Sequence, residues 1–464
     1  MSKFIAFVIA GMYLVATSPL LAQGLPTDLQ EFLNSLTPDQ QAQFKAFAEA
    51  GDPIAGGYKE GLMFDGIFPD PGQFSTQQYY PGTETLADNE MRITFMGSCP
   101  CVREDQSGMS IYVELGNGDS MMFDIGAGSM HNYQSMRVPF TKMNTLFLTH
   151  LHADHMGDLP YWLMFRGWGA GWTAPDIYGP SGRTEKHGIN YAMEGLHQFL
   201  YWHEENFNVF PIGEGFDAIV HEFDYTKIGE VIYDKNGVTV KHWPTLHVSD
   251  GASSYRLDWN GRSMCFTGDG RPNKVTIEQC KGVDIMISEV FTETLKLQAL
   301  AVGVPPANTR MTYDNYHTSA YALGYICDKV GPRMCVGTHY TFDQAYNNET
   351  VAEVRTHWDG PFAFGAPDRV VFNVREDGIW HRDGVAPGLT QSPRPQLPPT
   401  YLVPVPVHQI EDIQSAWIRE MEIPPSEYYP EGYHPKLLKK WPLTEDFVVP
   451  IPEAMQDPKY KKSE

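Results

Sequence analysis

Basic residues are scarce in this sequence. Its 464 residues include 34 Lys and Arg against 57 Asp and Glu, a formal net charge of -23 at pH 7. Nucleic-acid-binding proteins draw most of their affinity from Lys and Arg on phosphate groups, so this composition disfavours a polyanionic partner. A small anionic substrate is still allowed, because a bound metal ion can dominate the charge of a local site.

Cysteine is also scarce, with six residues in the whole chain. This number is compatible with disulfides but too low for a disulfide scaffold. Cys99 and Cys101 flank Pro100, and such a pair can bind metal, but no second thiol pair in the sequence has ligand spacing. We therefore expect core packing or a disulfide at these two positions rather than a zinc–thiolate site.

Hydrophobic runs long enough to cross a membrane are absent after the N-terminus. There, Lys3 precedes an apolar run over residues 4–16, and Ala22 supplies a small residue for cleavage, a pattern typical of a signal peptide. We therefore predict an exported, soluble chain, periplasmic or extracellular after cleavage. The alternative is an uncleaved anchor, which the shortness of the apolar run disfavours.

The length allows one large domain with extensions, or two domains. No internal repeat is present, and no Gly-rich phosphate loop precedes a Lys-Ser/Thr pair. Composition and pattern divide the chain into four parts: a signal peptide (1–22), an N-terminal helical and wrapping extension (23–90), a central domain (91–384) and a Pro-rich C-terminal extension (385–464). In the extensions, helix starts are predicted at Thr27 and Thr37, and a short helix from Ile410 to Met421.

The strongest chemical signal lies in the stretch Thr149–Asp158. Three histidines and a carboxylate fall within six residues, namely His150, His152, Asp154 and His155. They follow the apolar run Met143–Leu148, which predicts a buried strand. Imidazole and carboxylate ligands suit zinc and related divalent ions, and a turn after a strand can direct all four side chains to one point. The alternative is a solvated turn, which the spacing and the following Gly157 disfavour.

Further candidates follow at the ends of predicted strands. Three strands between Val238 and Glu289 finish in His247, Asp269 and Glu289, and another over residues 333–340 ends in a histidine, His339. His317 comes just before a predicted helix over residues 321–330. The alternative, that the strand-end acids and His247 are only caps, explains less of the pattern.

For some other candidate site residues, the sequence allows two interpretations. Asp124, at a strand end, could orient a ligand histidine or cap a turn. His242 is a rival ligand to His247, but it lies in mid-strand, so His247 is preferred. Trp168 and Trp172 could line a substrate pocket or only pack. The remaining candidates lack ligand spacing and are expected at the surface or in packing: His131, His187, His197, His203 and His221.

From Met91 to Val374 the chain resembles the metallo-β-lactamase superfamily, and within it most closely the tRNase Z and arylsulfatase-like branch. It is also similar to exported members named after a guanitoxin-pathway hydrolase. The matching motifs are Phe123-Asp124-Ile125-Gly126, the Thr149 to His155 cluster, His247, Thr267-Gly268-Asp269, Ser288-Glu289, His317-Thr318-Ser319 and Thr338-His339. The resemblance implies an α/β fold, a four-layer αβ/βα sandwich, with N- and C-terminal extensions.

Carried over position by position, the resemblance implies two divalent metal ions, zinc or alternatively manganese or iron. The first ion would be held by His150, His152 and His247; the second by Asp154, His155 and His339; Asp269 would bridge both. Two metals joined by a carboxylate can hold a hydroxide that is nucleophilic near neutral pH. The predicted catalytic residues are Asp154, His317 and Glu289, with His317 as the acid that protonates the leaving group and Glu289 as its partner.

The sequence also departs from the nuclease pattern. Ser288 stands where that branch usually has histidine, no basic arm for tRNA is recognisable, and the chain is acidic. We therefore discount tRNA processing and predict an exported metal-dependent hydrolase of phosphoric or sulfuric esters, acting on a small anionic substrate. The alternatives are a lactonase or β-lactamase, an iron-dependent redox enzyme, and a noncatalytic protein with the same fold; a homo-oligomer is compatible with each.

Overall fold

The computed structural model describes residues 78–79, 85–167, 171–207, 213–301, 305–384 and 415–430. The predicted signal peptide, the helix starts at Thr27 and Thr37, Trp168 and most of the Pro-rich extension lie outside these ranges.

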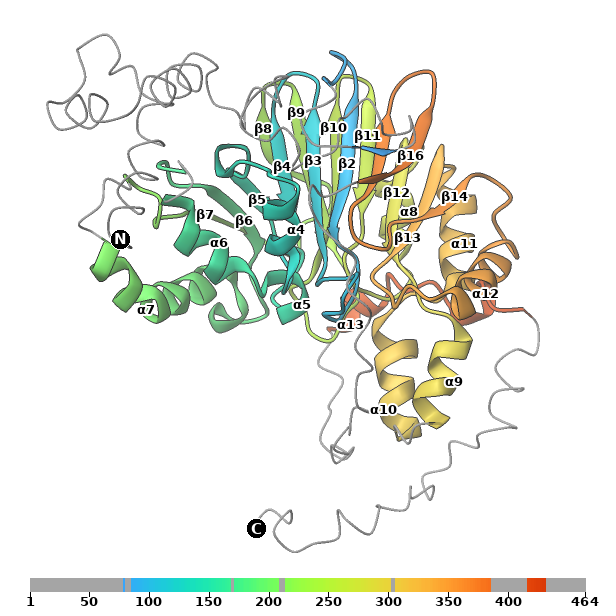
Figure 1. Ribbon diagram of the computed structural model, residues 1–464. Coiled ribbons are helices and arrows are strands. Elements are labelled where there is room, and N and C mark those ends of the chain that lie inside the picture. Colours follow the sequence, from blue (N-terminus) through green and yellow to red (C-terminus); the bar gives the residue numbers. More distant parts are fainter. Residues whose placement is uncertain are drawn as a thin grey trace, which may run out of the picture.

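Two β-sheets face each other, and helices cover their outer faces (Figure 1). The first sheet has nine strands in the order β1 (Gln78–Tyr79), β16 (Ile379–Gly384), β15 (Val370–Val374), β2 (Met91–Gly97), β3 (Ser110–Leu115), β4 (Ser120–Phe123), β5 (Thr145–Phe147), β6 (Asp176–Pro180) and β7 (Ile219–Phe223). The second has seven strands in the order β14 (Phe362–Phe364), β13 (Met334–Thr338), β12 (Ile285–Glu289), β11 (Arg262–Phe266), β10 (Ser253–Trp259), β9 (Val238–Pro244) and β8 (Glu230–Lys235). The chain thus builds most of the first sheet, then the second, and returns to the first with β15 and β16.

The helices follow the same division. On the side of the first sheet lie α4 (Ser129–Ser135), α5 (Ala153–Met156), α6 (Leu159–Arg166) and α7 (Ile189–Phe207). On the side of the second sheet lie α8 (Lys274–Gln279), α11 (Ala320–Val330) and α12 (Gln344–Val354). At the lower end in Figure 1 lie α13 (Ala416–Arg419) and the projecting pair α9 (Glu293–Ala301) and α10 (Pro306–Arg310). In the described part of the chain, none of these helices has the length and apolar character needed to cross a membrane.

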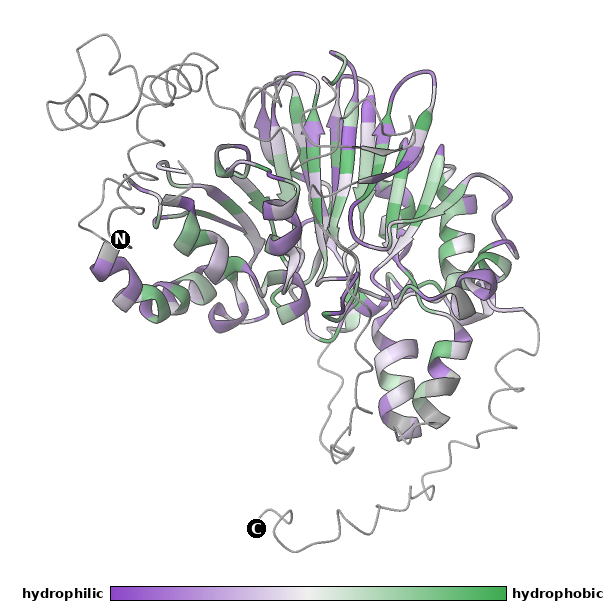
Figure 2. Cartoon of the chain, viewed as in Figure 1, coloured by the Kyte–Doolittle hydropathy of each residue, from purple (hydrophilic) through white to green (hydrophobic). Residues whose placement is uncertain are grey.

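Alternating side chains explain why the sheets stack as layers. In β11, Met264 and Phe266 enter the core between the sheets, whereas Cys265 enters the core under the helices. In β12, Ile285 and Ile287 face the first core and Met286 the second. Because a strand turns successive side chains to opposite faces, a strand apolar at every position must be covered on both sides. Figure 2 shows these strands as largely hydrophobic bands.

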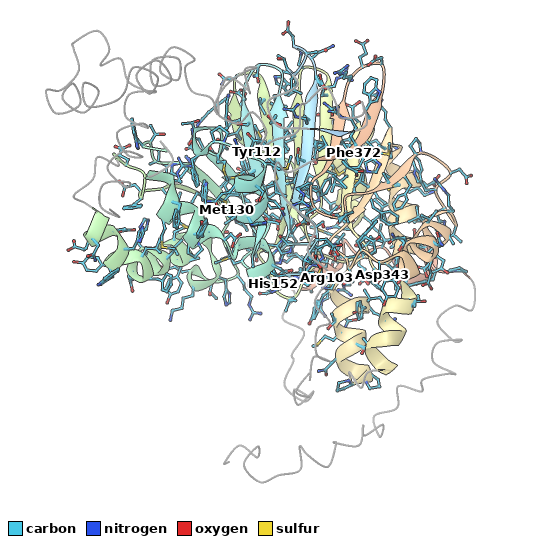
Figure 3. The ribbon with its side chains drawn as sticks, in the orientation of Figure 1. Arg103, Tyr112, Met130, His152, Asp343 and Phe372 are labelled. Carbon is cyan, nitrogen blue, oxygen red and sulfur yellow. A yellow bond between two sulfur atoms is a disulfide. The ribbon has the colours of Figure 1, made fainter. Side chains whose placement is uncertain are left out.

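The core between the sheets is rich in aromatic rings. Phe123 and Phe147 stack with ring centroids 5.0 Å apart, and Tyr255 of the opposite sheet lies 5.8 Å from each. The Tyr255 hydroxyl donates to the carbonyl of Leu148, so its polar end is satisfied inside the core. Each such ring contributes roughly 1.5–3 kcal/mol by burial. Figure 3 shows Tyr112 and Phe372 on the sheets, Met130 at the helical layer and His152 at the lower end. This α/β sandwich confirms the predicted fold class.

A two-residue hairpin turn lies at Asn260-Gly261. Both residues have positive φ, 45° and 75°, and they join β10 to β11 with Trp259 opposite Arg262. Asn and Gly tolerate the left-handed backbone that a two-residue hairpin turn requires.

Two predicted boundaries were wrong. The strand predicted over residues 143–148 is shorter, since β5 spans Thr145–Phe147. The helix predicted from Ile410 to Met421 is, among described residues, the single turn α13, which begins after Ser415. The helix ends early because Glu422 forms an antiparallel bridge with Asn273.

All six cysteines form disulfides. Cys99 pairs with Cys101, Cys265 with Cys280, and Cys327 with Cys335. Of the two roles expected for Cys99 and Cys101, core packing or a disulfide, the structure shows the disulfide, so neither sulfur is a thiolate ligand.

Candidate metal centre

The histidine-rich stretch lies at one end of the sandwich, directly after β5. His150 and His152 precede α5, and Asp154 and His155 lie in its first turn. The loop at Gly126 packs so closely against this turn that a Cβ on Gly126 would lie 1.9 Å from the Asp154 carbonyl oxygen. Glycine is therefore required at Gly126 for the backbone that carries Asp154 to take its place.

Four donors form the first cluster. His150 Nε2 lies 3.0 Å and His247 Nε2 3.2 Å from His152 Nδ1. Asp269 Oδ2 lies 4.0 Å from His150 Nε2 and 3.9 Å from His247 Nε2. One ligand atom from each of these four residues falls within 4.8 Å of the others, which suits a single ion.

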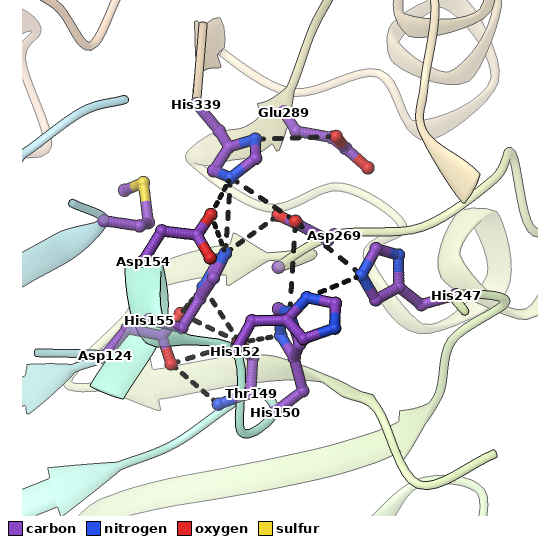
Figure 4. A network of polar contacts seen from close by, with 12 residues as sticks. Asp124, Thr149, His150, His152, Asp154, His155, His247, Asp269, Glu289 and His339 are labelled. Atoms are coloured by element: carbon purple, nitrogen blue, oxygen red, sulfur yellow. Dashed lines mark hydrogen bonds and ion pairs between the residues drawn. The ribbon is translucent and has the colours of Figure 1, made fainter. Parts of the chain in front are cut away.

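A second cluster shares Asp269. His155 Nε2 lies 3.2 Å from Asp269 Oδ1 and 3.3 Å from His339 Nε2. His339 Nε2 is 3.1 Å from Asp154 Oδ2 and 3.3 Å from Asp269 Oδ2. Figure 4 shows Asp269 between the two groups of histidines. Its carboxylate reaches both clusters, as a bridging ligand would.

The outward sides of the rings are hydrogen-bonded to the protein. His155 Nδ1 lies 2.7 Å from Asp124 Oδ2, and His247 Nδ1 lies 3.0 Å from the Tyr316 carbonyl oxygen. His150 Nδ1 is 3.0 Å from Thr149 Oγ1, which itself donates to Asp124. Asp124 therefore orients a histidine of the cluster, one of the two roles considered for it.

These contacts assign the ring protons and test whether the site fits a metal. A neutral imidazole carries one N–H, and the acceptors beside His155 and His247 place it on Nδ1. The inward Nε2 atoms then carry lone pairs, which face one another and the Asp269 carboxylate. Lone pairs and carboxylate oxygens at 3–4 Å repel unless a cation lies between them. The donor set therefore fits two divalent ions.

Burial and charge hold His247, Asp154 and Asp269 in the state that metals bind. Burial lowers the pKa of His247 to about 3, so its ring is neutral. Burial alone would raise the pKa of Asp154, but the hydrogen bond from His339 and the neighbouring histidines lower it to about 2. Burial likewise opposes the charge on Asp269, yet the facing His155 and His339 hold its pKa well below the usual range. Metal ligands must be deprotonated, and these three groups are. At His155, burial opposes a charged ring, but Asp269 and Asp124 outweigh it and raise the pKa well above its usual range, so a metal would have to displace a proton there.

Glu289 and His317 form a pair beside the second cluster. Glu289 Oε1 accepts the Gly270 N–H, and its Oε2 contacts His317 Nδ1 and lies 3.7 Å from His339 Nδ1. Burial disfavours a charged His317 ring, but the Glu289 carboxylate outweighs this and raises the His317 pKa to about 9. The His317 side chain is 19% exposed, whereas Glu289 is buried. The pair thus presents one protonated ring at the edge of the site.

A third donor set overlaps the second. Asp269, Glu289, His317 and His339 also offer ligand atoms within 4.8 Å of one another. Both oxygens of Glu289 are already engaged, by Gly270 and His317. We therefore assign Glu289 to His317 rather than to an ion.

The structure brings together all of the predicted site residues and separates the rejected ones. His242 lies in β9 away from the clusters, packed on Phe223 with ring centroids 4.1 Å apart. His221 stacks on Tyr178, and Trp172 donates its indole N–H to the Gly167 carbonyl. Trp172 is therefore anchored within its own loop.

Sequence reasoning missed two contributors. Thr149 had no assigned role, yet its hydroxyl links Asp124 to His150. The Tyr316 carbonyl, which orients His247, carries no side-chain signal at all. The position of Thr149 beside the histidines is the only sequence feature that could have pointed to either.

Comparison with known proteins gives matches over the same region. The sequence family described as anti-Pycsar protein Apyc1 matches residues 91–299, which is less than half of the chain. The ribonuclease Z of Mycobacterium avium (strain 104) is 26% identical over 266 residues, covering 54% of this chain and 86% of that protein. The ribonuclease BN of Proteus mirabilis (strain HI4320) is 24% identical over 308 residues, covering 58% of this chain and 96% of that protein.

Among solved structures, the metallo-β-lactamase fold protein YhfI from Bacillus subtilis matches with a TM-score of 0.46 and 17% identity. The match covers 62% of this chain and 100% of that protein.

Proposed function

Starting from its place in the metallo-β-lactamase superfamily of hydrolases, we propose that this protein is a dinuclear-metal phosphoric ester hydrolase for small anionic substrates. The observation that carries the proposal is the combination of seven converging donors with the Glu289–His317 pair. Related proteins named ribonuclease Z and ribonuclease BN support a phosphoester rather than another bond. Sulfuric esters share the same charge and are the second substrate class to test.

The chain's residues divide between the two ions. His150, His152 and His247 would hold the first ion, Asp154, His155 and His339 the second, and Asp269 both. When bound, a pair of divalent ions such as zinc lowers the pKa of a coordinated water and neutralises charge on an anionic ester. Manganese and iron accept the same donors.

His317 would hold a proton for the leaving group. Its Nδ1 contacts Glu289, which leaves Nε2 as the ring nitrogen directed away from this carboxylate. Glu289 is itself fixed by the Gly270 N–H, so the ring orientation is set before substrate arrives. An ester oxygen that leaves with negative charge is then protonated from a positioned donor.

A guanidinium lies close to the same end of the molecule. Arg103 Nη1 donates to Gln106 Oε1 at 3.2 Å, and Gln106 Nε2 donates to the carbonyl of Tyr340, the residue after His339. A positive charge held there favours an anionic substrate, because guanidinium groups bind phosphate oxygens well. The net charge of -23 disfavours a long polyanion, so a small ester is preferred over tRNA.

Export remains part of the proposal. Three disulfides in the described residues support it, because disulfides persist in oxidising compartments and are rare in the cytosol. The apolar run at residues 4–16 is the corresponding targeting signal.

Metal analysis combined with an ester panel tests the function. We expect about two metal ions per chain and hydrolysis of phosphodiesters or sulfate esters, lost together in His150→Ala. His197→Ala, which changes a partly exposed histidine on α7, serves as the matched control. A metal-free protein whose hydrolysis survives His150→Ala would overturn the proposal.

A further inference from the structure

The C-terminal segment over residues 415–430, which we name the strap, crosses the end of the sandwich where the donors lie. In Figure 1 its helix α13 is drawn at the lower end of the sandwich. The sequence predicted a Pro-rich extension here, with a short helix from Ile410 to Met421. Its contacts instead fall on the loops that carry metal ligands.

The strap first holds the loop of His247. Ser415 donates its backbone N–H to both carboxylate oxygens of Asp250, at 3.0 and 3.2 Å, and its hydroxyl to the same carboxylate. Asp250 is buried, so these bonds satisfy a charged group that water does not reach. Ile418, also buried, packs against Leu246, the residue before His247.

The strap next holds the loop of Asp269. Arg271 Nη1 donates to Glu422 Oε1 at 3.1 Å, the Ile423 N–H donates to the Pro272 carbonyl at 3.0 Å, and the Lys274 N–H to that of Met421 at 2.7 Å. Leu246 and Arg271 form a bridge between the two loops, with the Arg271 N–H donating at 2.8 Å. The strap therefore covers the point where the loops of His247 and Asp269 join.

Its last residues reach the neighbourhood of Glu289 and His317. Tyr429 donates its hydroxyl to Glu293, four residues after Glu289, at 3.3 Å. Glu427 accepts from Tyr325 of α11 at 2.5 Å, and the Tyr428 carbonyl contacts His357 Nε2 at 2.7 Å. One segment thus contacts the loops of His247 and Asp269 and also the helices α9 and α11, which follow Glu289 and His317 in the chain.

We propose that the strap is a positioning element of the metal centre, acting through Glu422 and Ile418 on His247 and Asp269. Neither ligand lies within a regular strand, since β9 ends at Pro244 and β11 at Phe266. Their loops therefore need an external support, because metal ligands must be held within a few tenths of an ångström. The inference rests on the proposed metal function.

The experiment compares Glu422→Ala and Ile418→Ala with Glu420→Ala in the full chain. Glu420 is an exposed glutamate of the same strap, two residues from Glu422. We expect zinc affinity, measured by chelator competition, to fall about 10-fold or more in the first two variants and to stay unchanged in Glu420→Ala. Glu422→Gln, which keeps an acceptor for Arg271, should recover part of the affinity.

Amide hydrogen exchange of the metal-free chains gives a second readout. We expect faster exchange over residues 244–252 and 267–275 in Glu422→Ala and Ile418→Ala, without a change over β2 and β3. If both variants match Glu420→Ala in zinc affinity and in loop exchange, the strap has no positioning role. If the unmodified chain binds none of zinc, manganese and iron, the proposed function fails, while the exchange comparison still decides whether the strap holds these loops.

Discussion

Asp124 and His339 both adopt a left-handed backbone, with φ of 60° and 53°. Non-glycine residues rarely do so, and such strain persists only where the surroundings enforce it. Asp124 is held by the Thr149 N–H at 2.7 Å and by His155, and His339 lies between Asp154 and Asp269. The backbone strain therefore falls on one donor of the second cluster, His339, and on Asp124, the carboxylate that orients another donor.

His317→Gln should separate catalysis from metal binding. The substitution removes the proton donor, so we expect kcat to fall about 10²- to 10⁴-fold with metal content unchanged. The loss should be largest for esters with poor leaving groups, such as alkyl esters, and small for nitrophenyl esters, which need no protonation. Full activity on every ester would argue against the acid role, and full activity on lactones alone would favour the acyl-hydrolase alternative.

Glu353 on α12 should make stability depend on pH. Burial raises its pKa to about 9, helped by the carboxylates of Glu349 and Glu293, and its Oε2 lacks a hydrogen-bond partner among described residues. The folded chain therefore keeps a proton that the unfolded chain releases above about 4.5. The resulting stabilisation is complete below that pH and is lost as the pH rises to about 9.

Glu353→Gln has no carboxyl group to titrate at this position. The free energy of unfolding of this variant, relative to that of the native chain, should therefore rise with pH by up to about 1.4 kcal/mol per pH unit. Urea unfolding at pH 5, 7 and 9 measures the difference. Glu194→Gln, on the exposed face of α7, is the control. Parallel pH profiles for native chain and Glu353→Gln would show that the carboxyl is ionised in the fold.

At the level of elements, glycines mark where segments approach closely. A Cβ at Gly126 would meet the Asp154 carbonyl oxygen at 1.9 Å, whereas a Cβ at Gly195 in α7 would meet nothing within 4 Å. We expect Gly126→Ala to lower the free energy of unfolding by about 1–3 kcal/mol or more and to weaken metal binding through Asp154. Gly195→Ala should raise it by about 0.5–1 kcal/mol, because alanine favours a helix. Thermal unfolding of both variants checks this, and equal effects would contradict it.

The sequence predicted those elements that depend on residues close together in the chain. The Asn260-Gly261 hairpin and the buried strand β12 follow from turn chemistry and an apolar run. The ends of β9 and β11 could not be predicted from such local rules, because the loops beyond these strands are shaped by the Leu246–Arg271 bridge. The strap was invisible for the same reason, since Ser415 bonds to Asp250, 165 residues away in sequence.

Across the whole molecule, the donors come from both sheets. His150, His152, Asp154 and His155 follow β5 of the first sheet, and His247, Asp269 and His339 come from loops of the second. Spacing within the first group made it recognisable in the sequence. The distant residues were assigned by resemblance to a family, because their meeting depends on how two sheets stack.

Metal should therefore stabilise the packing of one sheet on the other. At free zinc about 100 to 1,000 times the dissociation constant, we expect a gain of about 3–4 kcal/mol in the free energy of unfolding. Calorimetry with zinc and with a chelator measures this as a rise in Tm. A chain carrying both His150→Ala and His339→Ala should show no response, and an equal response there would place the stabilising ion elsewhere.

The spread of the donors over residues 150–339, with the strap reaching residue 430, also bears on biosynthesis. A chain that emerges from its N-terminus cannot close the metal centre until its last supporting segment has emerged. Four ligands are available early, but the partners that complete both coordination spheres come later. The proposed ions would therefore meet the complete donor set only after residue 339 and its support have emerged, and not when the first four ligands appear.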